Sequence, residues 1–159
     1  MDDVMFGLTL AASLGAGLVA GIFFAFSAFI MTALGRLPPE SGISAMQSIN
    51  VAVLNPVFFF VFFGTAVAAL ILAIAAFAGW SPSRSTCLLV GALLYLAGTI
   101  FVTMAFNVPL NNRLATTSAK STEGASVWKT YLSAWTAWNH VRTIAALAAC
   151  ASFILALRA

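Results

Sequence analysis

Four long apolar segments constrain the fold of this chain more than any other feature. They cover residues of about 4–34, 56–79, 86–106 and 137–157. Each supplies the about 20 residues that a helix needs to cross the hydrocarbon core of a bilayer. The chain is 62% hydrophobic and 7% charged, which is too little charge to cover the surface of a soluble domain. The sequence therefore predicts an all-α fold, an integral membrane four-helix bundle that forms a single domain over residues 1–159.

The distribution of charge predicts the location of the protein. The N-terminus, MDDVMF, is acidic, so the first apolar segment fits a retained helix better than a secretory signal. Four spans place both termini on one side and the connections 35–55 and 107–136 on the other. Those connections carry four basic residues against two on the side of the termini, Arg84 and Arg158. We expect an integral protein of a bacterial inner (plasma) membrane whose long connections face the cytoplasm. The net charge of +3 reflects scarce acid, so no nucleic-acid partner is expected.

The first apolar segment contains two patterns. Small residues recur every four positions at Ser13, Gly17, Gly21 and Ala25, a spacing that lets another helix approach closely. Its end, FFAFSAFIMTAL, places Ser27 among four phenylalanines. These aromatic residues either face lipid or form the wall of a ligand pocket that includes Ser27.

The connection after the first span predicts a short helix at the membrane interface. Pro38 and Pro39 end the first helix and are suited to start another, and apolar residues then recur at helical spacing. Asn55 precedes Pro56, which is the pattern of a helix N-cap followed by proline at the first helical position. Asn50 has no such structural role and is therefore a candidate binding residue.

The third apolar segment ends in a polar motif, NVPLNNRL. Pro109 removes a backbone hydrogen bond and disfavours helix at the residue before it, so we expect a kink or break there. The amides of Asn107 and Asn111 then have two interpretations. They either satisfy the backbone groups that the break sets free, or they line a polar pocket at the mouth of the bundle.

The stretch WKTYLSAWTAWNHVR, residues 128–142, leads into the fourth span. At about 100° per residue, one arc contains Trp135, Trp138, Asn139 and Arg142. His140 points about 140° away from Trp135 on the same basis. Arg142 lies about one turn inside the expected boundary of the span. It either extends to the headgroups or faces the bundle interior, where a charged residue indicates a functional site.

The polar residues of the spans gather at one membrane face. The end of the first helix, the short connection, the end of the third helix and the start of the fourth helix meet there. An aromatic pocket open to that face suits a flat or amphipathic molecule that partitions into the bilayer. Its candidate residues are Ser27, Asn50, Asn107, Asn111, Asn139, His140 and Arg142.

The inventory of side chains excludes several chemistries. The acids are Asp2, Asp3, Glu40 and Glu123, and none lies well inside a span. With a single histidine, one chain has too few ligands for a di-iron or multi-histidine copper site, so no metal is expected. Glycine patterns for nucleotide binding are absent from the sequence, so no cofactor is indicated.

Four motifs together resemble the anthrone oxygenase-like family of small four-helix membrane proteins. They are FFAFSAFIMTAL, AMQSIN followed by NP, NVPLNNRL, and W-x6-W-x3-NHVR. They occur in order over nearly the whole chain, and NVPLN and WNHVR are the most specific. For the fungal polyketide members, the resemblance implies oxidation of an anthrone to an anthraquinone by O2 without metal or flavin.

The resemblance implies a membrane-embedded, cofactor-independent oxygenase for a hydrophobic, anthrone- or quinol-like molecule. His140 is the one side chain of a type that ordinarily exchanges protons near neutral pH, so it is the candidate base. Arg142, with Asn139 or Asn107, would hold an oxyanion, and Trp135 and Trp138 would stack on the rings. The alternative is a non-catalytic membrane protein that binds a lipid-like ligand or a partner subunit. The sequence leaves open whether copies form a homo-oligomer.

Overall fold

The computed structural model describes residues 2–79 and 81–159. Trp80, which the sequence suggests as an interfacial anchor, lies outside these residues. Every regular element in the described part is helical. In chain order, the elements are α1 (Asp3–Ala25), the π-helical segment η1 (Phe26–Ile30), α2 (Met31–Gly35), α3 (Pro39–Ala52), α4 (Pro56–Ala78), α5 (Pro82–Leu93), the π-helical segments η2 (Leu94–Phe101) and η3 (Thr103–Asn107), α6 (Val108–Ala115) and α7 (Thr122–Arg158).

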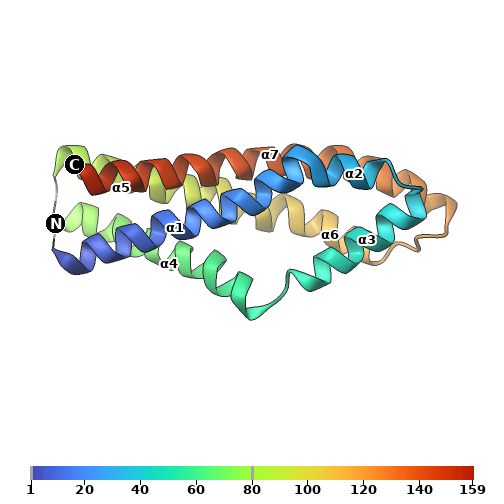
Figure 1. The fold of residues 1–159 in the computed structure, drawn as a ribbon, viewed down its shortest axis with the longest axis horizontal. Helices are drawn as coiled ribbons and strands as arrows, with labels where there is room; N and C mark the ends of the chain where they lie inside the picture. The colour runs from blue at the N-terminus through green and yellow to red at the C-terminus, as the bar shows by residue number, and fades with distance from the viewer. Residues whose placement is uncertain (1, 80) are drawn as a thin grey trace.

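The elements form four continuous rods that are long and apolar enough to cross a membrane. They are Asp3–Gly35, Pro56–Ala78, Pro82–Ala115 and Thr122–Arg158. Both termini lie at one end of the bundle, and α1 runs along α7 (Figure 1). This confirms the predicted all-α membrane bundle.

The connection between the first two rods forms the predicted short helix. α3 starts at Pro39, where the missing backbone N–H of proline costs no helical hydrogen bond, and it packs against α2, α6 and α7. The predicted N-cap of the next helix is also confirmed, because the Asn55 side chain accepts a hydrogen bond from the Phe58 N–H at 3.0 Å. α3 and α4 meet at an elbow that projects from the bundle (Figure 1). The placement of α3 at a membrane surface stays a prediction.

The expected break at Pro109 is wrong. The third rod continues through this proline to Ala115. The preceding turn, η3, is π-helical, and the Val108 N–H bonds to the Thr103 carbonyl five residues earlier. This wider turn accommodates a residue that cannot donate a hydrogen bond. α6 therefore extends the third rod, and much of the expected connection 107–136 is helical because α7 already begins at Thr122.

Two hydrophobic clusters fill the bundle. One cluster lies between α1, α4, α5, η2 and the C-terminal half of α7, and it contains Phe62, Tyr95 and Phe153. The other lies between α2, α3, α6 and the N-terminal half of α7, and it contains Met46 and Trp128. We call the second region the cap. α4 begins at Pro56, at the α3–α4 elbow, and contributes no residue to the cap. The two clusters are therefore separated at the level of this elbow.

α1 packs tightly on α4 at Gly15. A side-chain carbon at this position would collide with the Thr65 hydroxyl. The predicted stripe of small residues lies beside this contact: Gly21 is exposed, and a side-chain carbon there would meet nothing within 4 Å. Elsewhere in the stripe, Ser13 is buried, and a side-chain carbon on Gly17 would meet the Cys150 sulfur of α7 at 3.4 Å. The stripe therefore borders α7 in part, and the contact with α4 uses another face of α1.

We expect Gly15→Ala to lower the midpoint of thermal unfolding in detergent and Gly21→Ala to leave it unchanged or raise it slightly. Overpacking costs about 1–3 kcal/mol, whereas alanine at an open helical position gains about 0.5–1 kcal/mol over glycine. The two variants differ only in position along α1. Equal midpoints would contradict the packing of α1 on α4.

Candidate functional site

A cavity of about 290 Å³ lies between the two hydrophobic clusters. This volume is at the lower end of the about 300–1,000 Å³ of small-molecule sites. Its walls come from α1, η1, α3, α4, η3, α6 and α7, and most of them are apolar. The lining residues are Ile22, Phe23, Phe26, Met46, Ile49, Asn50, Val53, Leu54, Phe58, Phe59, Phe62, Phe63, Thr103, Met104, Val108, Asn111, Trp135 and Arg142.

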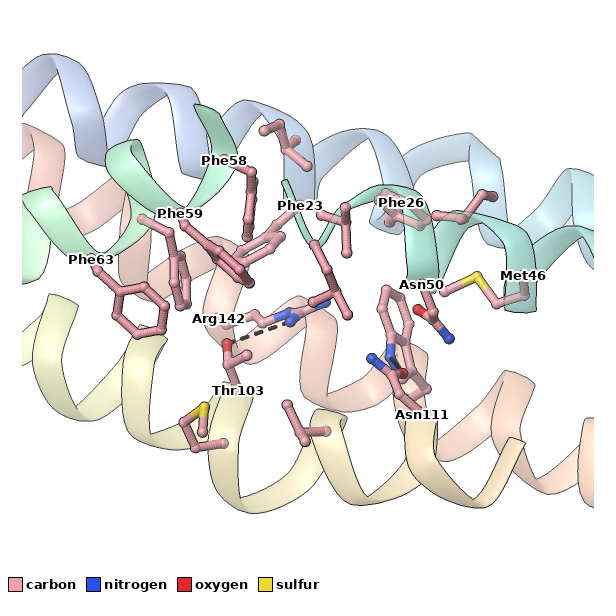
Figure 2. Close-up of a pocket in the computed structure, with 18 residues that line it drawn as sticks. Phe23, Phe26, Met46, Asn50, Phe58, Phe59, Phe63, Thr103, Asn111 and Arg142 are labelled. Atoms are coloured by element: carbon pink, nitrogen blue, oxygen red, sulfur yellow. Dashed lines mark hydrogen bonds between the residues drawn. The ribbon is translucent and has the colours of Figure 1, made fainter. Parts of the chain in front are cut away.

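Arg142 carries the positive charge of the cavity. It is 6% exposed, and its guanidinium carbon lies 3.9 Å from the ring centroid of Phe23 and 4.8 Å from that of Trp135. One of its terminal N–H groups donates to the Thr103 hydroxyl at 3.4 Å (Figure 2). The aromatic faces attract the cation and fix its plane. Arg142 therefore faces the bundle interior and does not extend to the headgroups.

Asn139 holds Arg142 in this position. Its side-chain oxygen accepts a hydrogen bond from the Arg142 Nε at 2.9 Å. Its amide nitrogen donates to the Phe23 carbonyl at 2.8 Å and to the Ser27 hydroxyl at 2.7 Å. Both ends of this fully buried amide are therefore used. Asn139 joins α7 to the junction of α1 and η1 and orients the guanidinium from behind.

The charge of Arg142 has no counter-ion in the described part of the chain. The one ion pair there joins Lys120 to Glu40, at 3.7 Å, far along the cap. Two of the five N–H groups of Arg142 have hydrogen-bond acceptors among the described residues. The others lie in the cavity wall. The cavity therefore presents an uncompensated cation, a site that suits an oxyanion.

Amide groups form the cap side of the cavity. The Asn111 side-chain oxygen accepts two hydrogen bonds of 2.8 Å, one from the Tyr131 hydroxyl and one from the Trp135 Nε1. The Asn50 amide donates to the Tyr131 hydroxyl at a long 3.5 Å. Figure 2 shows Asn50 and Asn111 on one side of Arg142 and the phenylalanines of α4 on the other. A bound molecule would meet polar groups at one end and rings at the other.

The predicted site residues divide into three groups. Asn50, Asn111, Trp135 and Arg142 line the cavity. Ser27 and Asn139 lie behind Arg142 and support it.

The remaining predicted residues lie outside the cavity wall. Asn107 is fully buried and donates to the Trp135 carbonyl at 3.2 Å, while its own oxygen has no partner among the described residues. Trp138 stacks on Phe106 with ring centroids 3.7 Å apart. His140 is exposed on the opposite side of α7. The helical periodicity predicted this separation of His140 from Trp135, whereas no finding tests its catalytic role.

The sequence did not reveal the aromatic wall supplied by α4. No residue of this helix was a candidate site residue from the sequence, yet four of its phenylalanines line the cavity: Phe58, Phe59, Phe62 and Phe63. The run PVFFFVFF at its start is a signal in retrospect, although an apolar run does not show which face is buried. In the first rod, the phenylalanines split: Phe23 and Phe26 line the cavity, and Phe24 and Phe29 are exposed.

The described residues contain no group of three histidine, cysteine or acidic side chains arranged to hold a metal ion. Fold and site together define a membrane-spanning helical bundle with a cationic and aromatic cavity.

Residues 58–152 match the sequence profile of the family described as anthrone oxygenase. The match covers more than half of the chain and includes the NVPLNNRL and WNHVR motifs. The protein therefore belongs to the anthrone oxygenase family. Comparisons with curated proteins and with solved structures give no match.

We expect Asn139→Ala to destabilise the fold strongly. The substitution leaves the buried Arg142 Nε without a partner and removes the side-chain hydrogen bond to the Phe23 carbonyl, which keeps only its backbone bond from the Phe26 N–H. This costs about 2–4 kcal/mol in free energy of unfolding. The measurement is the midpoint of thermal unfolding in detergent. Asn112→Ala is the matched control, because Asn112 is exposed and its side chain makes no hydrogen bond among the described residues. A similar small shift in both variants would contradict the central role of Asn139.

Proposed function

We propose that the protein binds a hydrophobic aromatic molecule of anthrone or quinol type in the cavity and promotes its oxidation by O2. The observation that carries this proposal is the buried, uncompensated guanidinium of Arg142 between two aromatic rings. Membership of the anthrone oxygenase family supports the reaction class. The cavity volume of about 290 Å³ suits a compact ring system.

Arg142 would act on the oxygen of the substrate. An anthrone has a carbonyl opposite an acidic methylene, and loss of a methylene proton moves negative charge to the carbonyl oxygen. A preorganised cation in a water-poor site stabilises this charge far more than water does. Thr103 holds one edge of the guanidinium and Asn139 the other, so little reorganisation is needed when the charge forms. Asn50 and Asn111 would bind a second oxygen at the other end.

The chemistry balances with O2 as the oxidant. The anthrolate carbon gives electrons to O2, and a carbon–oxygen bond forms to yield a hydroperoxide. Loss of the remaining hydrogen on that carbon breaks the O–O bond and releases water. The products are the anthraquinone and one water for each anthrone and O2 consumed. The role of the protein in this scheme is to stabilise the anion and to position the ring.

Two versions of this mechanism differ in the group that accepts the methylene proton. His140 was the candidate from the sequence, and it lies on the exposed face of α7. The polar side chains of the cavity wall are Asn50, Thr103, Asn111 and Arg142, and none is an ordinary base. We therefore favour a mechanism in which Arg142 increases the acidity of the bound substrate and a water molecule that enters the cavity with it accepts the proton.

We expect Arg142→Gln to lower the rate of anthrone oxidation by about 10²–10³-fold, the usual effect of removing an oxyanion donor. His140→Gln should keep most of the rate, because its side chain is outside the cavity. The measurement is anthraquinone formation under O2 by purified protein in lipid. A wild-type rate equal to that of protein-free lipid would overturn the enzymatic proposal. A loss in His140→Gln as large as in Arg142→Gln would restore His140 as the base.

The second candidate is a non-catalytic protein that holds a lipid-like ligand, favoured by the absence of a base in the cavity wall. Native mass spectrometry of the purified protein distinguishes the two. An oxidised aromatic product in the cavity supports the enzyme, whereas a ligand recovered unchanged after exposure to O2 supports the binding protein.

We also propose that the cap faces the cytoplasm of a bacterial inner membrane. Four basic residues lie at the cap end of the bundle, against two at the end of the termini.

A further inference from the structure

The mouth of the cavity has an apolar rim. Phe63 is 44% exposed and Met104 is 53% exposed, and both line the cavity. On the cap side, the lining residues Met46 and Trp135 are 1% and 3% exposed. The cavity is therefore closed at Met46 and Trp135 and open between α4 and η3, and the opening extends to Leu54 at the elbow, which is 63% exposed. Figure 2 shows Phe59 and Phe63 on one side of this opening and Thr103 on the other.

The length of α4 sets the depth of the mouth in the bilayer. Its 23 residues form a helix of about 35 Å, which matches a hydrocarbon core of about 30 Å. Phe59 and Phe63 lie three and seven residues inside its first residue, Pro56. At about 1.5 Å per residue, they are about 5 and 10 Å from that end. Phe63 is therefore at the level of the acyl chains, and Phe59 is near the boundary of the hydrocarbon core.

The rods on either side of the mouth are held together at its edge, next to Phe63. The Tyr95 hydroxyl donates to the Phe62 carbonyl at 3.0 Å and ties η2 to α4. Beyond this bond, toward the elbow, α4 and the third rod are separated by the lining side chains of the cavity. Of the exposed side chains at the mouth, Met104 is flexible and adapts its rotamer to a passing molecule. Phe63 packs on the rings of Phe59 and Phe62, with ring centroids 5.8 and 5.2 Å apart.

We propose that the mouth between α4 and η3 is a lateral portal through which the aromatic substrate enters from the bilayer in its neutral form. The proposal rests on the proposed function and adds the route to the cavity. A neutral fused-ring molecule concentrates in the hydrocarbon core, whereas its anion does not. The portal offers no polar group until the molecule reaches Thr103 and Arg142. It therefore selects lipid-dissolved, uncharged ring systems over water-soluble charged ones.

The test measures how fast a fluorescent hydroxyanthraquinone binds the full-length protein in lipid vesicles. Visible excitation of the probe avoids tryptophan emission. Met104→Trp narrows the portal, and Phe101→Trp is the matched control, because Phe101 is 60% exposed on the same rod and does not line the cavity. We expect Met104→Trp to slow association and release alike, each by about tenfold for a barrier raised by about 1.4 kcal/mol. The rates of the control should match the wild type.

A second comparison uses an alkylated and an unsubstituted hydroxyanthraquinone at equal free concentration in water. Loading from the bilayer predicts an association rate that increases with the membrane partition coefficient. Equal rates for the two probes, or a Met104→Trp variant that associates at the wild-type rate, would overturn the portal while leaving the proposed function intact. Failure of the wild type to bind either probe would overturn the proposed function and the portal with it. Should Met104→Trp not fold, Phe63→Ala widens the same mouth and should accelerate both steps.

Discussion

The desolvated cation of Arg142 is the constraint on which the rest of the structure depends. Moving such an ion out of water costs several kcal/mol even after the protein relaxes. Asn139, Thr103 and the rings of Phe23 and Trp135 offset part of that cost. These groups come from α1, η3 and α7, so the charge can be accommodated only when three of the four rods are correctly packed. Binding site and fold are therefore stabilised by the same contacts.

The π-helical segments explain how straight apolar rods produce such a site. η1 follows Phe23 and contains Ser27, and η3 begins at Thr103. Each segment inserts a wider turn at the level of Arg142, and wider turns of this kind are frequent at functional sites because they redirect side chains. η1 turns the Ser27 hydroxyl toward Asn139. η3 places Thr103 against Arg142 and also lets the helix pass through Pro109.

Much of this arrangement follows from local sequence rules. The length of the apolar segments predicts the rods, and the Asn55–Pro56 pair predicts the N-cap of α4. The helical period separates His140 from the face of Arg142. What could not be predicted depends on contacts between distant segments. Trp138 shares the arc of Arg142 in a helical wheel, yet it stacks on Phe106 of the third rod. The wall of α4 is likewise hidden, because an unbroken apolar run has no period that marks its buried face.

The two halves of the cavity make opposite demands on a ligand. The portal is apolar and lies among acyl chains, so it admits a neutral molecule; the far wall carries an unpaired cation, so it stabilises an anion. A weakly acidic ring system satisfies both demands by losing its proton after it enters. Stabilisation that arises only as the charge develops is the kind that lowers a reaction barrier, since the neutral ground state does not share it. Placing Arg142 at the inner end of an apolar route thus couples substrate selection to activation without a base in the wall.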